Sequence, residues 1–177
     1  MTATKKSSLV APVVVLTIIA FAIAAILAFV NDLTAPVIQA QEEAAAQAAL
    51  LEVMPDGTDF TDVTGLELPE NVVKVQQAGN GAGYVFTTYG KGFGGNIQVM
   101  VGIDPEGAIT GTKVLTHGES AGISDPVVGD GSEFQQQLPG VTDVSEIEAV
   151  SGATKSSNGM IAAIEAAFDA LALVNAE

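Results

Sequence analysis

The chain has 177 residues, of which 48% are hydrophobic, with 21 Asp and Glu, six Lys and Arg, one histidine and no cysteine. The formal net charge of −15 argues against binding to nucleic acid and to anionic lipid surfaces, because both require basic side chains. The lack of cysteine excludes disulfides, a lipoprotein anchor, c-type haem attachment and cysteine-ligated iron–sulfur clusters, and a single histidine argues against a zinc site. Any redox chemistry must therefore use an organic cofactor.

The first predicted element is an uncharged run at residues 9–30 (LVAPVVVLTIIAFAIAAILAFV). A helix of this length spans about 33 Å, enough to cross a hydrocarbon core of roughly 30 Å. The alternative is a cleaved signal peptide, because Lys5 and Lys6 precede the run. The run is longer than the usual apolar region of about 7–15 residues, and no small-residue cleavage site follows it. We therefore predict one transmembrane helix at residues 9–30.

The charges on the two sides of this run predict its orientation. Lys5 and Lys6 lie before it, whereas all 21 acidic residues lie from Asp32 onward together with only four lysines. The positive-inside rule places residues 1–8 in the cytoplasm and the rest outside, in a single-pass protein of the inner or plasma membrane. The outer segment has a formal charge near −17, which is 4 minus 21.

Residues 31–55 are predicted to form a juxtamembrane helix or stalk. The Ala- and Glu-rich stretch at 36–54 begins with Pro36, which suits the first position of a helix. The turn residues Pro55-Asp56-Gly57 end it. Residues 56–177 then form the predicted extracytoplasmic domain, which starts with an acidic, irregular stretch to residue 70.

The middle of this domain has the pattern of a β-sheet. Four runs rich in Val, Ile, Thr and Tyr alternate with short Gly, Pro and Asp turns, a pattern typical of an antiparallel meander. The predicted strands are residues 72–77, 84–89, 97–103 and 109–116.

The last third of the chain is predicted to be mainly helix and loop. Residues 117–131 are glycine-rich, and residues 133–138 form a short helix. Residues 156–174 form a longer helix with one apolar face. The apolar positions of this helix are Met160, Ile161, Ile164, Phe168, Leu171 and Val174. The predicted fold class is α+β: a curved antiparallel sheet flanked by helices and preceded by one transmembrane helix.

Two glycine- or serine-rich stretches could approach a ligand. Residues 90–95 match the dinucleotide pattern G-x-G-x-x-G, but a strand follows where that motif requires a helix, so we predict a turn between strands. Residues 151–157 (SGATKSS) lack the glycine that precedes the lysine of a P-loop. Small residues, hydroxyls and a helix start nevertheless suit a phosphate. The alternative is that Ser156 or Ser157 only caps the helix.

The only histidine, His117, ends a predicted strand and is followed by Gly118-Glu119-Ser120-Ala121-Gly122-Ile123. Such a histidine is either an ordinary surface residue or one that faces a ligand.

Taken together, the stretches GKGFGGNIQVMVGIDPEGAITGTKVLTHGES and SGAT resemble the FMN-binding domain family. The resemblance extends over nearly the whole chain to the G subunit of the Rnf ion-pumping ferredoxin:NAD oxidoreductase. It extends, more distantly, to the C subunit of the sodium-pumping NADH:quinone oxidoreductase. It implies that FMN is attached covalently by a phosphoester to the hydroxyl of Thr154, installed outside the cytoplasm by a flavin transferase that uses FAD.

The family's second element runs roughly His-x-Glu-Thr-Pro-Gly-Leu-Gly and lies beside the flavin ring. Here Ala121 replaces its proline and Ser124 its last glycine. The phosphate-site pattern and the resemblance together predict two groups of cofactor-binding residues, and we expect no catalytic or metal-binding residue. The first group is Ser151, Gly152, Ala153, Thr154, Lys155, Ser156 and Ser157; the second is His117, Glu119, Ser120, Gly122 and Ile123.

The expected function is electron transfer within an Rnf complex, with FMN as cofactor, other membrane subunits as partners and no complete catalytic activity alone. Two alternatives keep the flavin: a stand-alone membrane-anchored flavoprotein for electron transfer or sensing, and the C subunit of the quinone reductase. A third, without redox chemistry, is a structural ectodomain whose SGATKSS stretch is only a helix cap.

Overall fold

The computed structural model describes residues 10–176, and the chain divides into two compact units, up to Ala45 and from Ala46 onward. The first unit is most of helix α1 (Val10–Val53). Residues Pro12–Ala35 of α1 have a mean hydropathy of 3.1 and none of them is buried in the protein, so this stretch is long and apolar enough to cross a membrane. The predicted cytoplasmic segment 1–8, including Lys5 and Lys6, lies outside the described residues.

Helix α1 continues without a break through the predicted start of a second helix. The sequence favoured a new helix beginning at Pro36, but this residue lies inside α1. Proline lacks the N–H that would bond to the carbonyl four residues earlier, which costs helix stability without preventing the helix from continuing. The prediction of a separate stalk helix at residues 36–54 is therefore wrong in its N-terminal boundary, although its helical character is confirmed.

The second unit contains a five-stranded antiparallel sheet whose strands follow in chain order. The four predicted strands are confirmed within two residues at each end, and a two-residue strand that the sequence did not predict pairs at one edge. The strands are β1 (Thr61–Asp62), β2 (Val72–Gln77), β3 (Tyr84–Lys91), β4 (Asn96–Ile103) and β5 (Ile109–His117).

Four helical segments follow β5. Helix α4 (Thr154–Val174) confirms the long C-terminal helix, and α3 (Glu133–Gln136) confirms the short one, two residues shorter than predicted. Helix α2 (Asp125–Val128) and the 3-10 turn η1 (Val144–Glu146) were not predicted. The α+β fold class is confirmed.

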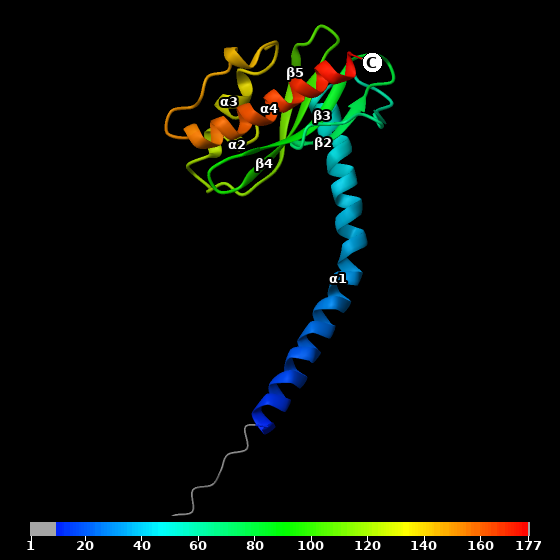
Figure 1. The fold of residues 1–177 in the computed structure, drawn as a ribbon, viewed down its shortest axis with the longest axis vertical. Coiled ribbons are helices and arrows are strands. Elements are labelled where there is room, and N and C mark those ends of the chain that lie inside the picture. Colours follow the sequence, from blue (N-terminus) through cyan, green and yellow to red (C-terminus); the bar gives the residue numbers. More distant parts are fainter. Residues whose placement is uncertain (1–9, 177) are drawn as a thin grey trace, which may run out of the picture. The chain divides into compact units, whose positions relative to one another are not determined.

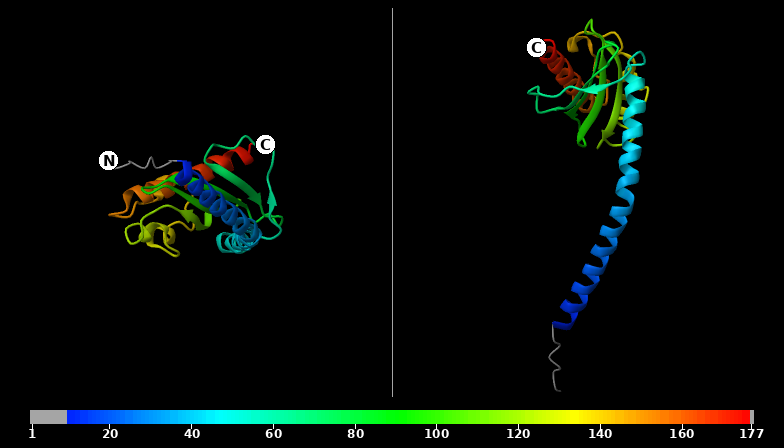
Figure 2. Two further views of the ribbon diagram at one scale, coloured as in Figure 1. Left: turned by 90° about the horizontal axis from the view of Figure 1, so that it is seen from below. Right: turned by 90° about the vertical axis from the view of Figure 1, so that its right-hand side faces the viewer.

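Helix α4 covers one face of the sheet, as Figures 1 and 2 show. Phe86 of β3 and Val99 of β4 are fully buried on this face together with Met160 and Ile164 of α4. Burial of such side chains removes about 2 kcal/mol each of unfavourable hydration. The Thr88 hydroxyl donates to the Ala163 carbonyl at 2.7 Å, so the contact also has a polar anchor.

The opposite face of the sheet carries the last two turns of α1, which belong to the second unit. Leu50 and Val53 are buried there against Val85 and Met100, the strand residues that alternate with those facing α4. The Thr110 hydroxyl donates to the Val53 carbonyl at 2.5 Å and fixes the end of the helix. The sheet is therefore buried on both faces.

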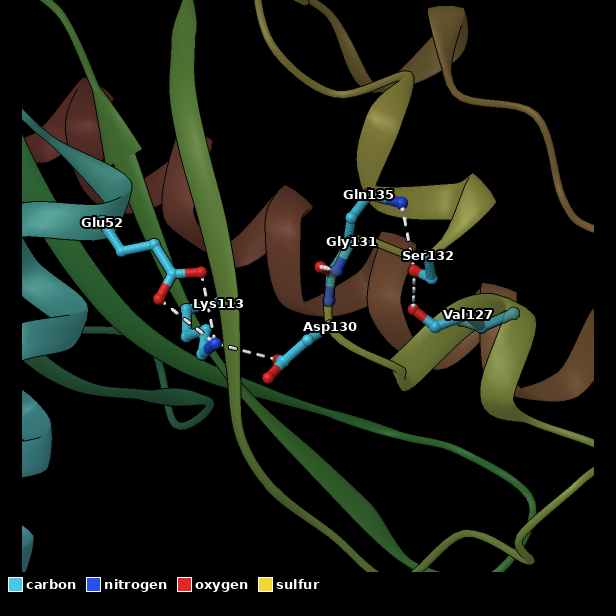
Figure 3. A network of polar contacts seen from close by, with 7 residues as sticks. All are labelled: Glu52, Lys113, Val127, Asp130, Gly131, Ser132 and Gln135. Carbon is cyan, nitrogen blue, oxygen red and sulfur yellow. Dashed lines mark hydrogen bonds and ion pairs between the residues drawn. The ribbon is translucent and has the colours of Figure 1, made fainter.

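Lys113 of β5 joins three elements of this unit (Figure 3). Its ammonium lies 3.1 Å from Glu52 of α1 and 2.9 Å from Asp130, which follows α2. The hydrogen bond to Asp130 is the main influence on the pKa of Lys113. With the contribution of Glu52 it raises that pKa above the ordinary 10.5, against the opposing effect of burial.

We expect Lys113→Met to lower the free energy of unfolding by about 1 kcal/mol at neutral pH, because both ion pairs are lost near the surface. Since the pKa of Lys113 is raised in the folded state, the stabilisation is complete below pH 10.5, the ordinary pKa of lysine. It is lost as the pH rises through the pKa that Lys113 has in the folded protein. Urea unfolding of both proteins at several pH values measures this. Lys74→Met is the control, because Lys74 has one partner, Asp62, and is more exposed. Equal losses in the two variants would contradict the role of Lys113.

Candidate functional site

The glycine-rich segment between β3 and β4 forms a tight turn, as predicted, in which the Gly92 N–H donates to the Gly95 carbonyl at 2.8 Å. At this turn the backbone lies close to another part of the protein, the start of α4. A Cβ on Gly90 would overlap the Gly159 carbonyl and lie 2.9 Å from the Ala163 nitrogen, both in α4. The absence of side chains at Gly90 and Gly159 therefore lets the start of α4 lie directly against the end of β3.

Helix α4 begins at Thr154, two residues earlier than predicted. Its N-cap is Ala153, which has no side chain able to cap, so the interpretation of Ser156 or Ser157 as the cap is wrong. Ser157 is buried inside the first turn. Its hydroxyl donates to the Ala153 carbonyl at 3.1 Å and accepts from the Val150 N–H at 3.0 Å. This serine thus fixes the loop that leads into the helix.

This start leaves the first turn of α4 open to a ligand. The N–H groups of residues 154–156 have no carbonyl one turn earlier in the helix, and the helix dipole places partial positive charge around them. Gly152 has φ +85°, a left-handed conformation that glycine adopts without strain, and it turns the chain into the helix. The side chains of Thr154 and Lys155 are exposed.

A cavity of about 320 Å³ lies beside this helix start. Three segments that are distant in the sequence form it: the β3–β4 turn, the loop between β5 and α2, and the first residues of α4. The lining residues are Phe93, Glu119, Ser120, Ile123, Ser124, Gly152, Ala153, Thr154, Lys155 and Ser156.

Glu119 links these three segments. One carboxylate oxygen accepts from the Gly94 N–H at 2.8 Å, and the other accepts from the Ser156 hydroxyl of α4. Burial is the largest single influence on the pKa of Glu119 and raises it. The hydrogen bonds from Ser156 and from the N–H groups of residues 93–95 together outweigh burial, so the pKa lies below the ordinary 4.5. Glu119 is therefore ionised at neutral pH.

We expect Glu119→Gln to destabilise the protein by about 1 kcal/mol at neutral pH, because the amide is a weaker acceptor for these donors. Since the pKa of Glu119 is lowered in the folded state, the carboxylate's contribution to stability is fully present above pH 4.5, the ordinary pKa of glutamate. It shrinks as the pH falls through the pKa that Glu119 has in the folded protein. Denaturant unfolding from neutral to acidic pH measures the difference between the proteins. A difference that does not depend on pH would contradict the assignment to the carboxylate.

The cavity brings together eight of the twelve residues that the sequence suggested as cofactor-binding. Those that line it are Glu119, Ser120, Ile123, Gly152, Ala153, Thr154, Lys155 and Ser156.

The other four residues lie outside the cavity lining. His117 is exposed, and its Nδ1 accepts from the Glu119 N–H at 3.3 Å, so it supports the loop. Gly122 has φ +87° and its N–H donates to Asp125 at 3.0 Å. Ser151 is exposed and lines a separate hollow with Glu133, Gln137 and Glu148. Ser157 is buried, with its hydroxyl bonded to the loop that precedes α4.

Two lining residues were not predicted from the sequence. Phe93 lies at the tip of the glycine-rich turn, is 70% exposed, and has the Lys155 ammonium 5.8 Å from its ring centre. Ser124 is buried, and its hydroxyl donates to the Ser120 carbonyl at 2.8 Å. The signal for Phe93 was an aromatic side chain in a glycine-rich turn, where no core position is expected. The signal for Ser124 was its place at the end of the family's second element, where it replaces a glycine.

Comparison with known proteins identifies two regions of the chain. Residues 92–169 match the family model of the FMN-binding domain, a range that contains all ten lining residues of the cavity. Residues 1–53 match the model of the RnfG N-terminal region, which corresponds to α1 and the residues before it.

Relatives align with most of the chain. It is 32% identical over 174 residues to the G subunit of the ion-translocating oxidoreductase complex of Methanosarcina acetivorans, an alignment that covers 89% of this chain and 91% of the relative. It is 30% identical over 165 residues to the G subunit of the Na⁺-translocating ferredoxin:NAD⁺ oxidoreductase complex of Acetobacterium woodii, covering 85% and 78%. The proton-translocating counterpart of Clostridium ljungdahlii is 27% identical over 164 residues, covering 87% and 86%.

The apolar span of α1 and the similarity to subunits of ion-translocating complexes both indicate a membrane protein. The cavity, the FMN-binding domain that contains it and the extent of the alignments lead to one assignment. The chain belongs to the family of G subunits of ion-translocating oxidoreductase (Rnf) complexes.

Proposed function

We propose that this protein is the electron-transferring G subunit of a membrane-bound ion-translocating ferredoxin:NAD oxidoreductase and carries FMN on Thr154 through a phosphoester. The observation that carries the proposal is the position of Thr154. Its side chain is exposed, lines the cavity and belongs to the first residue of α4. The proposed ester would therefore place a phosphate beside the open N–H groups of the helix start, which favour an anion.

The residues of the cavity fit an FMN group. The volume of the cavity, about 320 Å³, lies within the range of roughly 300–1,000 Å³ that is typical of small-molecule sites. Phe93 and Ile123 offer apolar surface for a flat ring system, and Ser120 offers a hydroxyl near the same space. The cavity thus combines an apolar part with a phosphate-compatible end, as the two halves of FMN require.

A bound flavin supplies reversible electron transfer, and the protein's role is to hold it and adjust its surroundings. Thr154 would anchor the group and prevent its loss to the medium. Glu119 and Ser120 would place a fixed negative charge and a hydrogen-bonding group at the wall of the cavity. Phe93 and Ile123, exposed to 70% and 67%, would exclude water from part of the ring.

The proposed attachment would require the domain to lie outside the cytoplasm, because the family resemblance puts the flavin transferase there. The Thr154 hydroxyl oxygen would form a bond to the phosphorus of the FMN half of FAD. The bond from that phosphorus to AMP would break, and AMP and the hydroxyl proton would be released. The positive-inside rule, applied to Lys5 and Lys6, supports the same orientation. Other membrane subunits of the complex would be the electron donor and acceptor.

The test is intact mass spectrometry of the full chain purified from a host that has the flavin transferase. The expected mass is that of the polypeptide plus one FMN minus one water, with a fluorescent band at the same position on a denaturing gel. A protein of bare polypeptide mass from such a host would refute covalent attachment. Co-purification of multi-spanning subunits from the native membrane would distinguish a component of an Rnf complex from a flavoprotein that acts alone.

A further inference from the structure

Lys155 is a lysine at the cavity that forms no ion pair with any described residue. The ion pairs in the described part of the chain involve Lys74 and Lys113. Lys155 instead lies at the second position of α4, next to Thr154, with its ammonium over the ring of Phe93. The negative face of an aromatic ring attracts a cation placed over it, so Phe93 holds the ammonium at the cavity wall.

The charges of the cavity make this position significant. Glu119 and Lys155 are the two charged residues of its lining. The Glu119 carboxylate is already bonded to Ser156 in the first turn of α4. A phosphodiester on Thr154 would bring a second negative charge to the same helix start, in a segment whose formal charge is near −17 (4 minus 21 from Asp32 onward). Repulsion between the two anions must be offset locally, and Lys155 is the cation available in the lining.

We propose that Lys155 pairs with the phosphate of the flavin and selects phosphorylated flavin over riboflavin, with Phe93 positioning the ammonium. This inference rests on the proposed function, because it requires a flavin in this cavity. Unlike the helix dipole, which every helix start provides, the ammonium is a full charge that one substitution removes.

The test compares the affinities of FMN and riboflavin for the full chain produced without flavin transferase and held in detergent. Quenching of flavin fluorescence gives both dissociation constants. We expect Lys155→Gln to weaken FMN binding about ten-fold, as for loss of a charge-assisted contact, and to leave riboflavin binding unchanged. Lys155→Arg should keep the preference for FMN. Lys91→Gln is the matched control, because it removes the same charge from an exposed lysine outside the cavity lining.

The outcomes separate the two proposals. Equal FMN affinities for Lys155→Gln and Lys91→Gln would overturn the role of Lys155, as would an equal loss of riboflavin binding. If free FMN binds too weakly to measure, covalent loading after a fixed time with the transferase replaces it, and Lys155→Gln must load less than Lys91→Gln. A wild-type chain that neither binds FMN nor gains its mass would instead refute the proposed function itself.

Discussion

Replacement of Thr154 by valine is expected to abolish covalent flavin completely while leaving the fold intact. Valine has the shape of threonine but no hydroxyl, so no phosphoester can form. The side chain is exposed and makes no contact with the core that the substitution would remove, so stability should change by less than about 0.5 kcal/mol. Intact mass and gel fluorescence of the full chain from a host with the flavin transferase measure the loss.

Two further variants make this result specific to the hydroxyl of residue 154. Thr154→Ser keeps a hydroxyl at the same position and should retain covalent flavin, although a smaller fraction of the chains is expected to be loaded. Thr64→Val removes an exposed hydroxyl in the loop between β1 and β2, outside the cavity lining and the SGAT motif, and should load fully. Covalent flavin on the Thr154→Val protein would place the attachment elsewhere and refute the assignment.

The strands of this fold could be predicted because each has a regular pattern and a clear end. Alternating faces and turns such as residues 104–107 define β2 to β5 in the sequence alone. Strand β1 and helix α2 could not be predicted, because two and four residues are too few to show any periodicity. The start of a helix at Pro36 was favoured by local propensity, which a long continuous helix overrode.

In the candidate site, too, some features could be predicted from the sequence and others could not. Thr154 and Glu119 were suggested by short motifs and by resemblance, and both line the cavity. The motif did not reveal that Ser157 bonds backward to the loop and that Ala153 occupies the cap position, because serine is the commoner cap. Phe93 joins the site only through the fold, since the β3–β4 turn meets a helix start that lies far along the chain.

That meeting depends on two glycines, Gly90 at the end of β3 and Gly159 in the second turn of α4. At neither position does φ require glycine; the requirement is the closeness of the two backbones. A Cβ on Gly90 would overlap the Gly159 carbonyl, and backbone cannot move aside as a flexible side chain can. The same contact fixes the first turn of α4, which carries Thr154, beside the turn that carries Phe93.

We therefore expect Gly90→Ala to lower the free energy of unfolding by about 3 kcal/mol, the upper part of the usual range for overpacking. For a domain of this size that corresponds to a fall in Tm of roughly 10 °C, measured by circular dichroism of the full chain in detergent. Gly95→Ala in the adjacent turn is the matched control, because its Cβ would meet nothing closer than 3.7 Å. It should change Tm little. Similar Tm values for the two variants would show that helix and sheet can separate slightly without cost, and the close contact would then not be what positions Thr154.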